Sequence, residues 1–286
     1  PELYCFGGYN TWPARTAGLE PAAEPRLVEA ALGLFEALAD RKRRPLPVCA
    51  GPYVNAVRAA GPQAFWPLDT LSGEVCADLS GNNHQARCEP GVAFFVEGPP
   101  LKETGHPDGI CRAVHCAGGR IAATLPVPGD AYSVELWFWN GLPCDARAVT
   151  GYILSRGRDR EPGAPGEHLG IGGTDGDGRA AGRLIVYNGD EKRTLLAGGT
   201  VLEPRRWYHV IYVRQGRDIA VYLDGRATPE ISGALEPGCP RDTPSLWIGG
   251  RSDALFGLEG KLSQVAVYDR ALTPGEAAEH YRAGMA

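Results

Sequence analysis

The sequence contains few of the features that mark membrane-spanning, disordered or zinc-binding proteins. No run approaches the roughly 20 apolar residues that a membrane-spanning helix needs. Hydrophobic residues make up 43% of the chain, which argues against wholesale disorder. The eight cysteines form no Cys-x-x-Cys pair and no histidine stands at zinc-finger spacing, so a structural zinc site is not indicated.

An excess of positive charge is also missing. The formal net charge is -5, and no basic stripe is apparent, so the sequence predicts no nucleic-acid partner. The one basic run, Arg41–Arg44, ends a predicted helix, where cations complement the helix dipole. The only methionine is Met285 and the chain begins at Pro1, so we interpret it as a processed chain or a part of a larger polypeptide or assembly.

The even number of cysteines allows disulfides without requiring them. Cys76 and Cys88 bracket a turn-rich segment and are the first pair that we expect to bond. Cys144 and Cys239 both fall in predicted loops, where a bridge is geometrically easy. Free thiols in a reducing compartment remain the alternative, because disulfides persist in oxidising environments.

What the sequence has in abundance is turn residues, with 39 glycines and 24 prolines. From residue 64 onward, short apolar runs alternate with Gly, Pro, Asn and Asp, which favours an all-β, two-sheet antiparallel sandwich. The predicted strands lie near 64–69, 110–116, 120–125, 132–139, 151–156, 167–172, 183–188, 207–214, 218–223, 245–249 and 260–268. A hairpin is expected through Gln215–Asp218, followed by a second turn at Asp224-Gly225.

Helices are predicted only near the two ends. Residues 25–44 have apolar side chains at helical spacing, and a shorter helix is expected over 53–60. Near the C-terminus, Thr273 and Glu276 have the spacing of a capping box for a helix over 274–282, which we expect to pack across an edge of the sandwich. Residues 1–52 are therefore predicted to be a helical extension, or the end of an upstream domain, and residues 53–286 the sandwich.

Seven motifs in order resemble the laminin-G-like jelly rolls of the concanavalin A-like lectin/glucanase superfamily, over roughly residues 53–283. The motifs are Tyr53–Asp69, Asp78-Leu79-Ser80-Gly81-Asn82-Asn83, Tyr132–Phe138, Trp207-Tyr208-His209-Val210, Val221–Gly225, Ile248-Gly249-Gly250 and Val267–Thr273. The resemblance implies a jelly-roll fold and a secreted or cell-envelope location. Jelly rolls host lectins, glycosidases and adhesion modules alike, so the fold does not fix the function.

Catalysis is not supported by the residues. Glycosidases need two carboxylates about 5–9 Å apart, and the best strand offers only Glu135. Gly-x-Ser-x-Gly is absent. The sequence therefore predicts that the protein is not an enzyme.

Ligand binding has a candidate site on the strand 132–139. Val134, Leu136 and Phe138 alternate with Glu135, Trp137 and Trp139, so the last three share a sheet face. Aromatic side chains beside a polar group often hold sugar rings. The alternative, which we favour, is that both tryptophans belong to the interior, because adjacent large aromatics are costly to expose. Two charged loops, 156–160 and 175–179, offer either a binding rim or solvated turns.

A structural calcium ion is the one cofactor to consider. Asp69, Asp78 and Asn82, with nearby carbonyls, are the oxygen ligands that calcium prefers. Relatives commonly add an acidic residue where this chain has Ser263-Gln264, so one expected ligand is missing. The same residues also serve as turn formers.

We expect a non-catalytic module that binds a glycan or protein ligand outside the cytoplasm and does not insert into membranes. A structural or assembly domain of a larger cell-envelope protein, and an accessory domain of a hydrolase, are the alternatives.

Overall fold

The computed structural model describes Gly33 and residues 50–286, except 107, 127–128, 158–165, 177, 189–194 and 236–243. The chain divides into two compact units, Pro1–Leu46 and Pro47–Ala286. The second unit begins a few residues before the predicted sandwich. The helix predicted over 25–44 lies outside the described residues, apart from Gly33.

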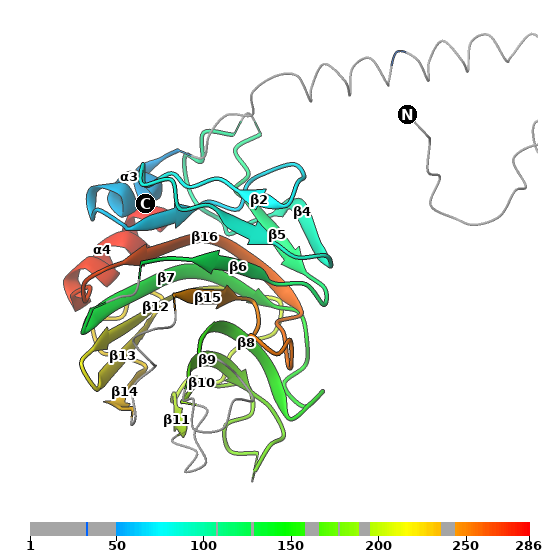
Figure 1. The fold of residues 1–286 in the computed structure, drawn as a ribbon, viewed down its shortest axis with the longest axis vertical. Coiled ribbons are helices and arrows are strands. Elements are labelled where there is room, and N and C mark those ends of the chain that lie inside the picture. Colours follow the sequence, from blue (N-terminus) through cyan, green and yellow to red (C-terminus); the bar gives the residue numbers. More distant parts are fainter. Residues whose placement is uncertain are drawn as a thin grey trace, which may run out of the picture. The chain divides into compact units, whose positions relative to one another are not determined.

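The second unit is a sandwich of two antiparallel sheets (Figure 1). The first sheet contains, in spatial order, β14 (Ile231–Ala234), β13 (Asp218–Leu223), β12 (Trp207–Gln215), β7 (Ala131–Asn140), β16 (Gly260–Tyr268), β5 (Arg112–Cys116) and β4 (Val92–Glu97), and β1 (Ala64–Trp66) also pairs with β16. The second contains β11 (Leu195–Ala197), β10 (Leu184–Tyr187), β9 (Glu167–Gly172), β8 (Val149–Arg156), β15 (Ser245–Ile248), β6 (Ile121–Thr124), β3 (Ala86–Cys88) and β2 (Val75–Cys76). The predicted all-β, two-sheet fold is confirmed.

All eleven predicted strands exist, and five further strands were not predicted: β2, β3, β4, β11 and β14. The main core lies between the sheets and takes alternate residues of each long strand. Val134, Leu136 and Phe138 of β7 contribute to it, as the period-two pattern predicts. Leu169 and Ile171 of β9 enter the same core from the second sheet.

The predicted hairpin joins β12 to β13, with Gln215 paired to Asp218 across the turn. The second turn follows β13 and places Asp224 at φ 50° and Gly225 at φ 66°. Two successive positive φ angles are favoured by Asp and Gly, which explains why this dipeptide marks the turn. Asp224 also accepts a hydrogen bond from the backbone N–H of His209, 2.9 Å away, and so ties the turn to β12.

Two helices accompany the sheets, α3 (Pro52–Ala59) and α4 (Pro274–Met285), and they contact each other. The capping box is confirmed, because the side chains of Thr273 and Glu276 each accept from the other's backbone N–H. The expectation that α4 crosses an edge was wrong. Tyr281 of α4 stacks on Trp137 of the central strand β7, with ring centroids 5.8 Å apart, so the helix covers a sheet face.

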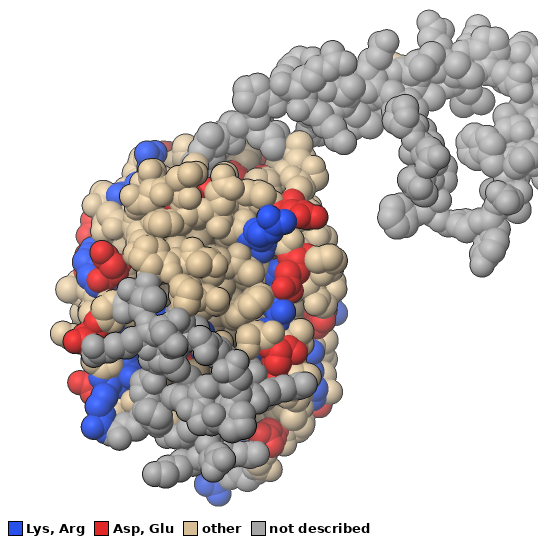
Figure 2. Space-filling view, viewed as in Figure 1, with Lys and Arg blue, Asp and Glu red and all other residues tan. Residues whose placement is uncertain are grey.

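None of the helices in the described part of the chain is long and apolar enough to span a membrane. Figure 2 shows basic and acidic side chains interspersed around an uncharged area on the face in view.

Candidate ligand-binding site

The face of β7 predicted to bind ligand lies beneath the two helices. Glu135 is fully buried and Trp137 is 2% exposed. Trp137 packs in a second apolar cluster with Tyr53 and Val57 of α3 and Ala277 of α4. Neither side chain is available as an open platform, so the placement of Trp137 agrees with the interior alternative. The alternating pattern of β7 assigned Glu135 and Trp137 to the same face correctly, but the two helices cover that face.

Glu135 is the centre of a buried hydrogen-bond network. One carboxylate oxygen accepts from the Tyr53 hydroxyl and the Nε2 of His209, each 2.9 Å away. The other accepts from the Tyr268 hydroxyl at 2.9 Å and the Nδ1 of His280 at 2.8 Å. Burial alone would raise the pKa of Glu135, but the two imidazoles hold that pKa well below its usual range. The carboxylate therefore joins both helices to the first sheet.

Trp139 lies on the same outer face and is partly exposed. The Lys261 ammonium sits 5.0 Å from its ring centroid, and the His115 ring is 6.3 Å away. Trp139 is thus separated from its two predicted companions, which the helices cover. The three residues do not form one accessible site.

The residues predicted to bind calcium are occupied by hydrogen bonds. The Asp78 carboxylate accepts from the backbone N–H groups of Phe65, Ser80 and His84 and from the Ser80 hydroxyl, each at 2.8 Å. The Asn82 amide donates to the carbonyls of residues 62 and 63. Asp69 lies 4.0 Å from His106.

These contacts are typical of turn-forming residues, because the Asp78 carboxylate oxygens already accept hydrogen bonds from the chain. No group of three or more His, Cys, Asp and Glu side chains within the described residues has the arrangement of a metal site. The calcium site stays a prediction.

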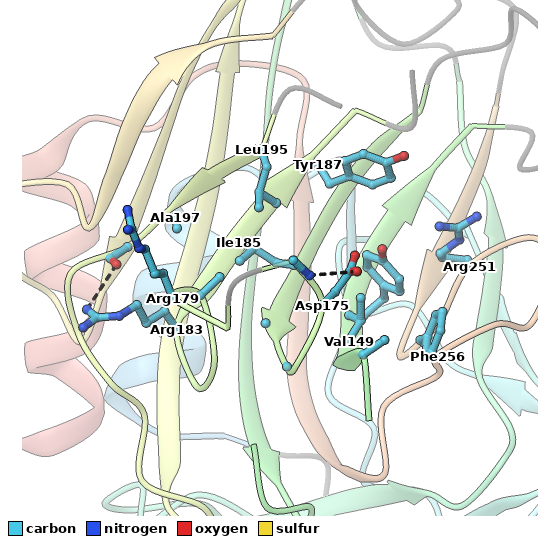
Figure 3. A pocket seen from close by; sticks show the side chains of 17 residues that line it. Val149, Asp175, Arg179, Arg183, Ile185, Tyr187, Leu195, Ala197, Arg251 and Phe256 are labelled. Atoms are coloured by element: carbon cyan, nitrogen blue, oxygen red, sulfur yellow. Dashed lines mark hydrogen bonds between the residues drawn. The ribbon is translucent and has the colours of Figure 1, made fainter. Parts of the chain in front are cut away.

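A cavity of about 870 Å³ opens on the outer face of the second sheet (Figure 3). Its residues come from β8, from the last residue of β9, from β10 and β11, and from the adjoining loops, chiefly those after β9 and β15. The described lining residues are Ala148, Val149, Tyr152, Gly172, Gly173, Asp175, Gly176, Arg179, Ala180, Arg183, Ile185, Tyr187, Leu195, Ala197, Gly198, Arg251 and Phe256. This volume is typical of a small-molecule or oligosaccharide site.

The cavity follows from the row of residues that faces away from the main core. Tyr152 of β8 pairs with Gly170 of β9, which pairs with Ile185 of β10. Gly170 carries no side chain between its two bulky neighbours, and a Cβ there would meet the Tyr152 ring at 3.0 Å. The missing side chain keeps this row compact. Tyr152 and Ile185 form a small apolar cluster of their own, with Phe256 packed against it.

Two loops are fixed beside this floor by backbone contacts. The N–H groups of Thr174 and Asp175 donate to the carbonyls of Arg147 and Ala148, each at 3.0 Å. Gly173 permits this approach, because a Cβ there would lie 2.1 Å from the Arg147 carbonyl oxygen. The Arg147 guanidinium in turn donates to the Gly257 carbonyl in the β15–β16 loop. These contacts hold the loop after β9 and the β15–β16 loop beside the floor of the cavity.

A laminin G family model, described as the Concanavalin A-like lectin/glucanases superfamily, matches residues 118–278, more than half of the chain. The chain belongs to this superfamily. The resemblance drawn from the seven motifs is thus confirmed. The comparison with curated proteins found no match.

Several solved structures share the superfamily's fold with this chain. Domain 4 of AbnA, a GH43 extracellular arabinanase from Geobacillus stearothermophilus solved in complex with arabinotriose, has a TM-score of 0.55 at 18% identity, covering 77% of this chain and 98% of that one. Trypanosoma rangeli sialidase in complex with 2,3-difluorosialic acid has a TM-score of 0.54 at 18% identity, covering 78% of this chain and 32% of the sialidase. The binding domain of Paraclostridial Mosquitocidal Protein 1 has a TM-score of 0.55 at 16% identity, covering 78% and 52%. At these identities the likeness concerns the fold.

The sequence patterns predicted only some of the residues that line the cavity. The charged loop 175–179 was considered as a binding rim, and Asp175 and Arg179 do line the cavity. Of the second charged loop, residues 158–160 lie outside the described part. Tyr187, Arg183 and Phe256 were not singled out, because no motif marks a cavity assembled from three separate loops and strands.

Proposed function

We propose that this chain is a non-catalytic recognition module that binds a glycan in the cavity of the second sheet, outside the cytoplasm. The observation that carries the proposal is the preformed cavity of about 870 Å³, with aromatic walls and hydrogen-bonding side chains at its edge. Sugar rings stack on aromatic faces through their C–H groups and use charged and amide groups for their hydroxyls. Tyr187 and Phe256 are both partly exposed and supply such surfaces.

We propose a non-catalytic role because the described lining of the cavity offers too few carboxylates for glycoside hydrolysis. Among the described residues that line the cavity, Asp175 is the single acidic side chain. Glycoside hydrolysis uses two carboxyl groups on opposite sides of the scissile bond, one as acid and one as nucleophile or base. A site with one carboxylate is better suited to holding a sugar than to cleaving it.

The module would function within a larger glycan-acting protein or at a cell envelope. Support comes from its likeness to almost the whole of domain 4 of the arabinanase and to about a third of the sialidase chain. An accessory domain of a hydrolase is therefore the second candidate. It uses the same cavity, to hold a substrate that another domain cleaves.

A glycan array with the purified chain and two alanine variants tests the proposal. Tyr187→Ala removes an aromatic wall of the cavity, and Trp139→Ala is the matched control on the outer face of the other sheet. We expect selective glycan binding that Tyr187→Ala weakens by about 1–3 kcal/mol, while Trp139→Ala leaves it unchanged.

Each other outcome has a distinct meaning. Loss of binding in Trp139→Ala alone would move the site to the first sheet. An array without signal from a folded chain would reject glycan recognition. Release of reducing sugar from a bound oligosaccharide would reject the non-catalytic role, and repeating the array in EDTA tests the calcium prediction.

A further inference from the structure

Among the described residues that line the cavity, basic side chains outnumber acidic ones. Its described lining includes three arginines, Arg179, Arg183 and Arg251, and one aspartate, Asp175, although the whole chain has a formal net charge of -5. Asp253 neutralises Arg251 through two contacts of 3.2 and 3.1 Å. Of the described lining residues, Arg179, Arg183 and Asp175 remain after this pair is subtracted, and together they carry one positive charge.

Arg183 carries the excess. Within the described part of the chain its guanidinium donates from Nη1 to the backbone carbonyls of Gly198 and Gly199, and it forms no ion pair with a carboxylate. Carbonyls orient the guanidinium without cancelling its charge. Its Nε and Nη2 groups have no hydrogen-bond partner there, so two donors of the planar fork are left for a ligand.

Two of the three arginines lie at the opposite end of the cavity from Phe256. Figure 3 places Arg179 and Arg183 at one end, and Phe256 and Arg251 at the other, with Ile185 between them. A ligand that fits this order has a ring for the aromatic end and an anionic group for the guanidinium end.

We propose that the cavity selects acidic saccharides, with the anionic group of one sugar held by Arg183. The inference rests on the proposed function and specifies its ligand class. A carboxylate or sulfate presents two oxygens to a guanidinium fork, and such charge-assisted bonds are roughly twice as strong as neutral ones. Neutral sugars leave the Arg183 charge uncompensated.

The test measures the affinity of the full chain for three matched probes: an oligogalacturonide, its carboxyl-reduced neutral counterpart, and the same neutral oligosaccharide carrying sulfate. We expect the acidic probes to bind at least about tenfold more tightly than the neutral one, with an affinity that falls as NaCl rises. The sulfated probe shows whether a carboxylate is required or any anion suffices.

Variants at two positions assign the effect. Arg183→Gln should lower the ratio of acidic to neutral affinity about tenfold or more, and Arg183→Lys, which keeps the charge but loses the fork, should give a ratio between the two. Asp175→Asn should strengthen acidic binding by removing a like charge. Thermal unfolding of each variant checks that the fold is intact.

Two failures are distinguishable. Preference for the neutral probe, or acidic binding that is insensitive to Arg183→Gln, overturns acidic selectivity while leaving glycan recognition in place. Absence of binding to every probe and to the array overturns both.

Discussion

Replacing Glu135 by glutamine should detach the helices from the first sheet. The carboxylate accepts four hydrogen bonds of 2.8–2.9 Å, from Tyr53, His209, Tyr268 and His280. Glutamine keeps one acceptor oxygen and turns the other into an N–H₂ donor, so one imidazole N–H then faces a second donor. Breaking a buried charged pair costs about 3–5 kcal/mol, a large share of the roughly 5–15 kcal/mol that holds a domain folded.

Urea unfolding at about pH 6, below the raised pKa of His280, measures this cost. The emission of Trp137, which stacks on Tyr281, reports separately on the docking of α4. The matched control is Glu74→Gln, because Glu74 pairs with Arg87 on an exposed surface and should cost at most about 1 kcal/mol. A loss for Glu135→Gln no larger than the control's would refute the idea that this network holds the helices.

Three further predictions concern stability. Burial would lower the pKa of His280, but its bond to Glu135 raises that pKa overall. The stability that this bond adds is therefore complete below about pH 6.5 and is lost as the pH rises through the raised pKa. Urea unfolding across pH should show this decline, and His280→Asn should flatten it. The sulfur atoms of Cys76 and Cys88 lie 2.9 Å apart, so oxidised glutathione should join them in a disulfide that raises the free energy of unfolding by about 3 kcal/mol. Mass spectrometry should then show a loss of two hydrogens, and full alkylation of both cysteines after oxidation would contradict this. Thr273→Ala should lower the unfolding free energy by about 1 kcal/mol through loss of the cap, and Thr273→Ser, which keeps the hydroxyl, should restore most of it.

Of the two predicted disulfides, only the first involves described residues alone. Cys76 and Cys88 are free thiols in this structure, and Cys239, the proposed partner of Cys144, lies outside the described part. The two sulfur atoms share a hydrogen bond and so already lie close to each other in the reduced chain. The oxidation experiment therefore also tests the predicted extracellular location, since a stable bond fits an oxidising compartment.

The strands that sequence patterns failed to predict are mostly sheet edges. β4 and β14 are the two edges of the first sheet, and β11 and β2 are those of the second, with β3 next to β2. An edge strand pairs on one side only and is often short, so it needs no long apolar run. Leu195 in β11 is 49% exposed and shows how weak the signal becomes. The long inner strands β7, β8, β12 and β16 were predictable because nearly all of their side chains are buried.

The site was harder to predict than the fold because an alternating pattern assigns residues to faces without saying what covers each face. Glu135 and Trp137 were assigned to the same face correctly. However, α3 and α4, which lie at opposite ends of the sandwich's sequence, cover that face. The open face is on the other sheet, where loops distant in sequence supply the walls of the cavity. A burial pattern is local, whereas a cavity depends on which distant segments meet. Only the tertiary structure therefore distinguished the covered aromatic face from the accessible one.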